Sequence, residues 1–206
     1  MREAMYYVRE GNKIRCQLCP RECVLSEGKK GFCRSREVIN GSLIATAYGR
    51  TTSLALDPIE KKPLYHFHPG TMIVSLGPNS CNLTCKFCQN WEISQQEYPT
   101  RYVAIEDLIE IVKQQKDQQV AFTYTEPLMW YEYILDFSAK APEIDIVLVT
   151  NAYINKEPWR NILKVVKAVN IDIKSYRDEF YRQLCGGKLD IILANIIIAK
   201  EMDVHI

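Results

Sequence analysis

The pattern of apolar and polar residues changes in character near residue 71. Beyond that point, short apolar runs alternate with longer stretches in which apolar residues recur every three to four positions. Short apolar runs are typical of buried strands, and the longer pattern is typical of helices with one apolar face. Strands are therefore predicted over 72–77, 120–124, 144–150, 170–174 and 203–206.

Helices are predicted between these strands. From Ile105 to Val112 the apolar residues follow the i, i+3, i+4, i+7 spacing of one helix face. Pro127 suits the first turn of a second helix, through about residue 139, because proline lacks the amide hydrogen that this position leaves unpaired. Further helices are expected over about 155–169, 177–184 and 189–201.

Repeated strand and helix units of this length predict an α/β fold. A parallel sheet with helices packed outside it is the usual arrangement of such units. Because crossovers between parallel strands are right-handed, a β/α barrel or part of one is the expected closure. In such sheets, functional residues collect at the carboxyl ends of the strands.

The first 50 residues are different, with many cysteines, turn residues and charges and little local core. Asn40-Gly41 lies between two β-prone runs within 36–44, which predicts a β-hairpin. Residues 50–71 contain three prolines and are predicted to be a turn-rich connector. We therefore expect a cysteine-rich segment with its connector over 1–70, followed by a β/α unit over 71–206.

Four cysteines of the N-terminal segment share the spacing C-x2-C-x3-C-x9-C. They are Cys16, Cys19, Cys23 and Cys33. Four thiols within 18 residues could close a tetrahedral metal site or hold a second cluster. The alternative is four unrelated buried thiols, because free cysteine is often buried. The sequence leaves zinc, iron and no metal open.

The bulk composition narrows the classes of function. The 206 residues carry 26 basic and 25 acidic side chains, so nucleic acid and anionic membranes are not favoured partners. The N-terminus lacks the apolar region of a signal peptide, and no apolar run is long enough to span a bilayer. A cytoplasmic location is expected, where thiols stay reduced. The eight cysteines are thus predicted to be metal ligands rather than disulfides.

Three further cysteines follow the first predicted strand of the β/α unit. Cys81, Cys85 and Cys88 have the spacing C-x3-C-x2-C, so one loop could wrap a small inorganic body. Thiolates select zinc, copper(I) or iron–sulfur clusters. A structural zinc site normally takes four protein ligands, whereas an open position marks chemistry. Three ligands therefore favour a centre that binds a further molecule.

Polar residues also stand at or after the other predicted strands. They are Thr125 and Glu126 after the second strand, Asn151 after the third, and Asp172 and Lys174 at the fourth. We expect them to converge with the Cys81 loop on one face of the sheet. Each also has a structural explanation. Glu126 could place charge near a helix N-terminus, and Asp172 with Lys174 could be an ordinary ion pair.

Two other features have open roles. His66 and His68 alternate, which would place both rings on one side of an extended strand. They could be metal ligands or acid–base groups, or they could pack among the neighbouring aromatic residues. Cys185 belongs to neither cysteine group and is expected to be a buried or loop thiol, with a position near the substrate as the alternative.

The C-x3-C-x2-C loop, with Phe87 before its last cysteine, resembles that of the radical SAM enzymes. The resemblance is greatest to the branch related to pyruvate formate-lyase activating enzyme, and within it to the radical SAM member of the AMMECR1–Memo–radical SAM group. The stretches that carry it are 16–33, 57–67, 81–94, 124–127, 149–152 and 180–187. The resemblance implies an incomplete parallel β/α barrel of the radical SAM type, with the later strands absent and the sequence truncated at its C-terminus.

The resemblance also implies a cofactor site. Cys81, Cys85 and Cys88 would hold a [4Fe–4S] cluster. Its fourth iron would bind the amino and carboxylate groups of S-adenosylmethionine (SAM), and Phe87 would lie against the adenine.

Six further residues complete the implied SAM site. They are Tyr124, Thr125, Glu126, Asn151, Asp172 and Lys174. The first three stand where relatives carry a G-G-E-P turn that binds the methionine amino group, with Tyr124 and Thr125 in place of the glycines. The last three fall at positions that relatives use for the ribose or the methionine carboxylate.

The implied activity is that of a radical SAM enzyme, an oxidoreductase. Such an enzyme cleaves SAM reductively to a 5′-deoxyadenosyl radical, which abstracts hydrogen from a substrate that the sequence does not identify. One alternative is a glycyl-radical activating enzyme that acts on a partner protein. Another is a non-catalytic iron–sulfur or zinc module for electron transfer or interaction. The implied partners are ferredoxin or flavodoxin as electron donor, a protein or small-molecule substrate, and a second protomer at the open edge of the barrel.

Overall fold

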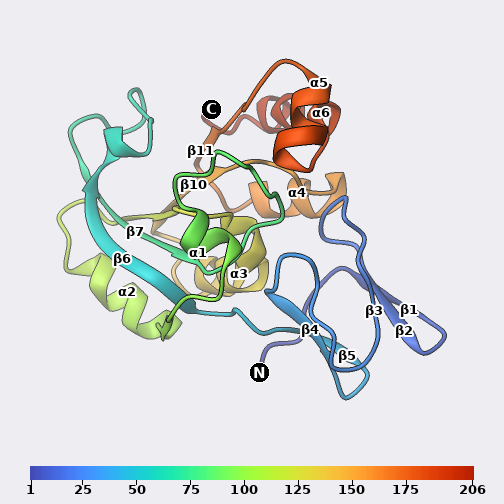
Figure 1. Cartoon of the computed structure of the whole chain (residues 1–206). Helices are drawn as coiled ribbons and strands as arrows, with labels where there is room; N and C mark the ends of the chain where they lie inside the picture. The colour runs from blue at the N-terminus through green and yellow to red at the C-terminus, as the bar shows by residue number, and fades with distance from the viewer.

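The computed structural model describes residues 1–206, and its main feature is a six-stranded sheet (Figure 1). In spatial order the strands are β11 (Ala168–Ile171), β10 (Asp145–Thr150), β9 (Gln119–Phe122), β7 (Met72–Pro78), β6 (Arg50–Pro58) and β8 (Arg101–Tyr102). The strands β7, β9, β10 and β11 run parallel, whereas β6 is antiparallel to both of its neighbours. The sheet stays open. The expected α/β fold with an incomplete parallel array is therefore confirmed.

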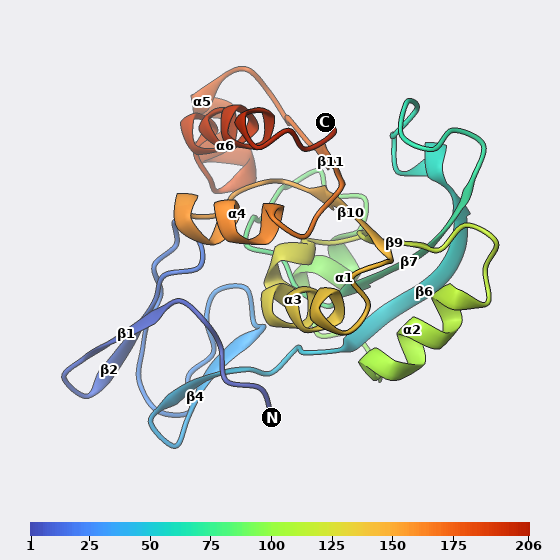
Figure 2. The same ribbon diagram turned by 180° about the vertical axis from the view of Figure 1, so that it is seen from behind.

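Helices follow each parallel strand, as the sequence pattern predicts. They are α1 (Trp91–Gln95), α2 (Ile105–Lys113), the 3-10 helix η2 (Pro127–Trp130), α3 (Tyr131–Lys140), α4 (Lys156–Leu163), α5 (Asp178–Phe180), the π-helix η3 (Tyr181–Cys185) and α6 (Leu189–Glu201). Figure 2 shows α3, α4 and α6 on the same side of the sheet. None of these helices has the length and apolarity that a membrane span requires.

The N-terminal segment forms two small antiparallel sheets. One contains β1 (Tyr7–Glu10), β2 (Lys13–Cys16) and β3 (Val24–Leu25), and the other is the hairpin of β4 (Arg36–Ile39) and β5 (Ser42–Ala45). The hairpin turns at Asn40 and Gly41, whose φ angles are 51° and 71°. Positive φ at both positions is what a two-residue hairpin turn requires, so the predicted hairpin is confirmed.

The first part of the predicted connector is instead a strand. Residues 50–58 form β6, which pairs with β7 from Thr51↔Pro78 to Pro58↔Met72. The turn-forming residues lie after this strand, where the short 3-10 helix η1 (Ile59–Lys61) begins. The sequence prediction was wrong here. It took the three prolines of residues 50–71 as evidence for turns throughout the segment, although the first part is a run of β-prone residues. The division of the chain at residue 70 stays a prediction.

The ends of several strands differ from those predicted. The second strand ends at Phe122 rather than at residue 124, because Tyr124 has a left-handed backbone with φ of 69°. At the C-terminus, the expected strand over 203–206 is a single parallel bridge between Ala168 and His205. The His205 carbonyl accepts a hydrogen bond of 2.8 Å from the Val169 amide, so the chain does run alongside β11.

Gly77 allows β7 to lie close to the segment after β9, and this contact yields a stability prediction. A Cβ atom at Gly77 would lie 1.9 Å from the Thr123 carbonyl oxygen, so the backbone would have to shift. Gly77→Ala should therefore lower the free energy of unfolding by about 3 kcal/mol, measured by urea denaturation. Gly31→Ala is the control, because its Cβ would meet nothing nearer than 3.7 Å. Equal stability of the two variants would contradict the packing described here.

Candidate active site

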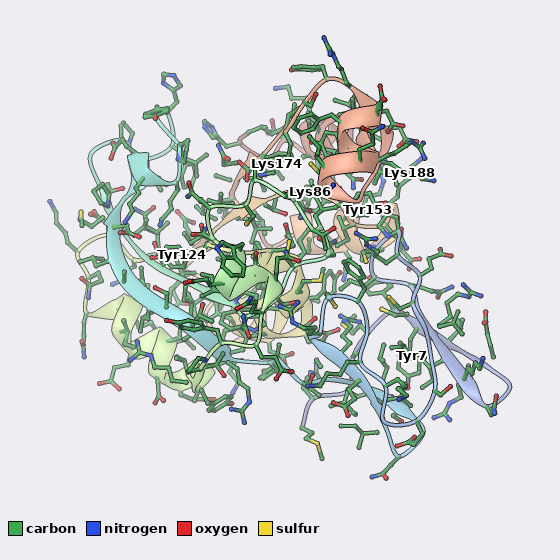
Figure 3. The ribbon with its side chains drawn as sticks, in the orientation of Figure 1. Tyr7, Lys86, Tyr124, Tyr153, Lys174 and Lys188 are labelled. Carbon is green, nitrogen blue, oxygen red and sulfur yellow. The ribbon has the colours of Figure 1, made fainter.

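A cavity of about 360 Å³ opens at the carboxyl ends of the parallel strands. Its lining includes Cys81, Cys85, Phe87, Cys88, Tyr124, Thr125, Glu126, Asn151, Asp172 and Lys174. These are the residues that the sequence predicted to converge, and they do converge. In Figure 3, Tyr124, Lys86 and Lys174 lie in one region of the molecule, around the loop that carries the three cysteines.

The Cys81 loop is held in place by hydrogen bonds from several elements. The Thr84 amide donates to the Cys185 carbonyl at 2.8 Å, and the Lys86 amide donates to the Leu184 carbonyl at 2.9 Å. On the other side, the buried Asn82 side chain donates to the Tyr153 carbonyl at 2.6 Å. The three thiols are half-buried. The loop therefore presents them to the cavity from a fixed backbone.

The surroundings of the thiols disfavour thiolates unless a cation is present. Burial raises the pKa of Cys81 far above its usual value, and burial together with the neighbouring Cys185 thiol raises the pKa of Cys85 to about 12. A positively charged metal centre would reverse this preference. Three thiols on one loop beside a cavity fit a polynuclear cluster, in which each thiolate binds a different iron.

Glu126 is the most buried carboxyl group of the cavity, with 1% of its surface exposed. Its carboxylate accepts hydrogen bonds from the Thr150 hydroxyl at 2.7 Å and from the amides of Asn151 and Leu128 at 2.8 and 3.1 Å. The Leu128 bond caps η2, as the structural explanation for this residue requires. The bonds from Thr150 and Asn151 also tie the end of β9 to the end of β10.

Burial makes Glu126 a source of pH-dependent stability. Desolvation outweighs the three hydrogen bonds and raises its pKa from 4.5 to about 7. The native protein therefore keeps a proton that the unfolded chain releases near pH 4.5, so stability falls as pH rises between these values. In urea denaturation of the metal-free protein, wild type should lose up to about 3 kcal/mol more than Glu126→Gln between pH 4.5 and 7.5. An equal loss in both proteins would contradict this assignment.

Asp172 and Lys174 form an ion pair of 2.8 Å at the rim of the cavity. Burial lowers the pKa of Lys174, but the Asp172 carboxylate and nearby anionic groups outweigh it, so the net shift is upward. Lys174 is thus a fixed cation that faces the cavity. Nearby, the Asn151 side chain approaches the Cys81 sulfur to 3.8 Å and donates to Asn82 Oδ1 at 3.0 Å.

Phe87 leaves half of its surface exposed, and its ring lies 5.4 Å from that of Phe180. The ring therefore borders the cavity and is not buried in the hydrophobic core. Cys185 is fully buried beside Cys85 and packs with Leu83 and Tyr181. The expectation of a buried thiol is met, and its position is next to the cysteine loop.

His66 and His68 lie away from the cavity. The segment that carries them is a series of bends rather than an extended strand, and His68 has φ of 46°. His68 pairs with Asp145 at 3.2 Å on the exposed surface, near the amino end of β10. The predicted alternation on one side of a strand is therefore wrong. The prediction rested on the alternating positions of His66 and His68, but three nearby turn-forming residues prevent an extended strand.

A network that sequence reasoning missed supports Tyr124. Its hydroxyl donates to the Asp57 carboxylate at 2.8 Å, and the same carboxylate accepts from Lys61 and Lys62 at 2.7 Å each. The Lys62 ammonium also lies 4.9 Å from the centre of the Tyr124 ring. At the other end, Asn90 of the cysteine loop donates to the Tyr124 carbonyl at 2.7 Å. The part of the sequence that could have indicated this network is the stretch Asp57-Pro58-Ile59-Glu60-Lys61-Lys62.

Comparison with known proteins gives one family match and several individual relatives, three of which are described here. Residues 77–206 match the radical SAM superfamily. An uncharacterized protein of Methanocaldococcus jannaschii is 45% identical over 212 positions, which cover 100% of this chain and 63% of that protein. A second uncharacterized protein of that organism is 29% identical over 203 positions, 93% of this chain and 55% of the protein.

The third relative is named for an activity. The 4-hydroxyphenylacetate decarboxylase activating enzyme of Clostridioides difficile is 26% identical over 125 positions, which cover 54% of this chain and 40% of that enzyme. The chain thus spans 63%, 55% and 40% of the lengths of these three proteins.

Proposed function

This chain belongs to the radical SAM superfamily, and on that premise we propose that Cys81, Cys85 and Cys88 bind a [4Fe–4S] cluster that leaves one iron free for SAM. The donor set supports this proposal, because three soft thiolates suit iron–sulfur ligation and a missing fourth ligand leaves a position open. The cavity supports it as well. The thiols border a space of about 360 Å³.

The proposed SAM site uses the other residues of the cavity. Lys174 supplies a cation for the methionine carboxylate, and Asp172 and Asn151 supply acceptors and donors for the ribose hydroxyls. Phe87 offers an exposed aromatic face for the adenine. Tyr124 and Thr125 line the same cavity beside the cysteine loop.

Glu126 has a double role in this proposal. A carboxylate has about four acceptor positions, and three are occupied by Thr150, Asn151 and Leu128. The remaining position is available for the methionine ammonium. Glu126 therefore holds the ends of β9 and β10 together and contributes one acceptor to the cofactor.

When bound by Cys81, Cys85 and Cys88, a reduced cluster of this kind would supply the electron for reductive cleavage of SAM, which is the chemistry that starts hydrogen abstraction from a substrate. The protein's part is to bind and orient the reactants and to exclude water from the site. The electron would come from a small donor protein such as ferredoxin or flavodoxin.

The substrate class has one specific indication. The likeness to 4-hydroxyphenylacetate decarboxylase activating enzyme over 54% of the chain favours a partner protein as substrate, with formation of a glycyl radical as the reaction. A small-molecule substrate is the second candidate. The non-catalytic alternative, a metal-stabilised module, is not favoured by the polar cavity beside the cysteines, since a closed electron-transfer site has no need of it.

The experiment is anaerobic reconstitution with iron and sulfide, reduction, and addition of SAM. We expect 5′-deoxyadenosine and methionine in equal amounts. A protein with a complete cluster at Cys81, Cys85 and Cys88 that forms no 5′-deoxyadenosine would refute the enzymatic proposal. The non-catalytic module predicts that result.

A further inference from the structure

A basic cavity of about 330 Å³ lies beside the C-terminal end of α1. It shares no lining residue with the cavity at Cys81 or with the space of about 10 Å³ that the four N-terminal cysteines line. Metal binding by those four cysteines stays a prediction. Three cations, Lys30, Arg34 and Arg50, and one anion, Glu97, line the basic cavity. Its formal charge is therefore +2, in a chain whose total is +1.

Arg34 is fixed in this cavity by the end of α1. One of its terminal nitrogens donates to the Ser94 carbonyl at 2.8 Å, and its Nε is buried without a partner. Its backbone is left-handed, with φ of 63°, which is uncommon for a residue with a side chain. No carboxylate of the chain pairs with this guanidinium. Its positive charge is therefore held in place but not neutralised.

The other two cations are more exposed. The Lys30 ammonium lies 3.5 Å from the Glu97 carboxylate, and such an exposed pair contributes little to stability, so an incoming anion can compete for it. Arg50, at the start of β6, is exposed and has no ion pair within the chain. Two unpaired guanidinium groups that line one cavity repel each other, and an anion between them would reverse this effect.

Hydroxyl groups add neutral donors to the same cavity. Thr46, Tyr98 and Thr100 line it, and their hydroxyls form no hydrogen bond within the chain. By contrast, the Asn79 side chain is fully engaged, since it donates to the Gln96 carbonyl and accepts from the Tyr98 amide, both at 2.9 Å. The cavity thus combines a fixed wall with free donors, which suits a ligand made mainly of acceptor oxygens.

We propose that this cavity binds the phosphate group of a phosphate monoester, with Arg34 and Arg50 as its main contacts. Such a group carries a charge of about −1.5 to −2 near pH 7, which matches the charge of the cavity. A carboxylate or a phosphodiester carries only a single negative charge. The planar guanidinium also fits phosphate oxygens in pairs. The volume leaves room for the rest of a small molecule, because ligand pockets begin at about 300 Å³.

The proposed phosphate site adjoins the cysteine loop without being part of its cavity. The Ser94 carbonyl accepts from Arg34, whereas the Ser94 hydroxyl lies 3.4 Å from the Cys88 sulfur. A ligand that contacts Arg34 would thus lie one residue away from the proposed cluster ligands. Phosphate binding here depends neither on a cluster nor on SAM cleavage.

The test is a 1H–15N nuclear magnetic resonance titration of the whole chain with methyl phosphate, at pH 7.5 and constant ionic strength. The side-chain Nε–H resonances of Arg34 and Arg50 should shift and saturate, with a dissociation constant of about 1 mM or tighter. Dimethyl phosphate is a monoanion and should bind at least about 10-fold more weakly. Absence of saturation, shifts confined to other parts of the chain, or equal binding of dimethyl phosphate would overturn the proposal.

Two variants that remove the same charge check the location. Arg50→Gln should weaken methyl phosphate binding at least about 10-fold, because a charged donor is lost. The exposed Arg50 side chain has no hydrogen bond within the chain, so this variant should fold normally. Arg9→Gln changes an exposed arginine of β1 outside the cavity and should stay within about 2-fold of wild type. Equal weakening in both variants would contradict a specific site. Failure of SAM cleavage would bear on the proposed function and not on this binding.

Discussion

Replacement of Cys88 by alanine is expected to reduce 5′-deoxyadenosine formation to the background level. The physical reason is that three thiolates are already the minimum for a cluster with one open iron, so removal of one leaves two irons without a protein ligand. Cys88 lies at the cavity, with its sulfur 3.4 Å from the Ser94 hydroxyl, and it has no large role in the core. The variant should therefore fold normally and fail chemically. The measurement is product formation by chromatography after anaerobic reconstitution and reduction.

Cys185→Ala is the matched control. The substitution is the same and the residue adjoins Cys85, but Cys185 lies outside the proposed ligand set. It should retain SAM cleavage within about 10-fold of wild type, since only a buried neighbour changes. Equal loss in both variants would assign the effect to packing around the loop, and full activity of Cys88→Ala would exclude this cysteine as a ligand.

Asp57→Asn should cause a large loss of stability even though the substitution keeps the side-chain size. The Asp57 carboxylate is bound by Lys61, Lys62 and the Tyr124 hydroxyl, and these donors hold its pKa well below the usual range despite burial. Lys62 is only 2% exposed. Loss of the carboxylate charge would leave its ammonium group buried and unpaired, which costs about 4 kcal/mol. Urea denaturation at pH 7 measures this cost.

Lys61→Ala tests the same carboxylate from the solvent side. The Lys61 side chain is 62% exposed, so its ion pair with Asp57 should contribute less than about 1 kcal/mol. A change of less than about 1 kcal/mol in Asp57→Asn would contradict the assignment of a charged Lys62, because a neutral amine would not need the carboxylate.

The pattern of apolar residues along the chain predicted those parts of the fold that depend on local interactions. The apolar run from Met72 places β7, and the spacing from Ile105 to Val112 places the buried face of α2. It did not predict β6, because the partner of that strand lies beyond a segment with many turns and only tertiary pairing reveals it. Similarly, the end of β9 depends on Tyr124, whose left-handed backbone is supported by contacts with distant residues.

The candidate site followed from one rule of topology. Polar residues after parallel strands converge, and Glu126, Asn151 and Lys174 do meet at one cavity with the cysteine loop. The rule could not predict the interactions that hold these residues in place. Asp57 and Tyr124 are 67 residues apart, and the raised pKa of Glu126 comes from burial that no short motif encodes. Such features depend on which segments pack together.

We expect the cluster at Cys81, Cys85 and Cys88 to have an open iron that binds SAM. Electron–nuclear double resonance of the reduced protein, with SAM labelled by 15N at the methionine amino group, measures this binding. We predict a coupling between the label and the cluster in wild type, and its absence in Cys88→Ala. A reduced wild-type cluster that shows no coupling at saturating SAM would contradict this expectation.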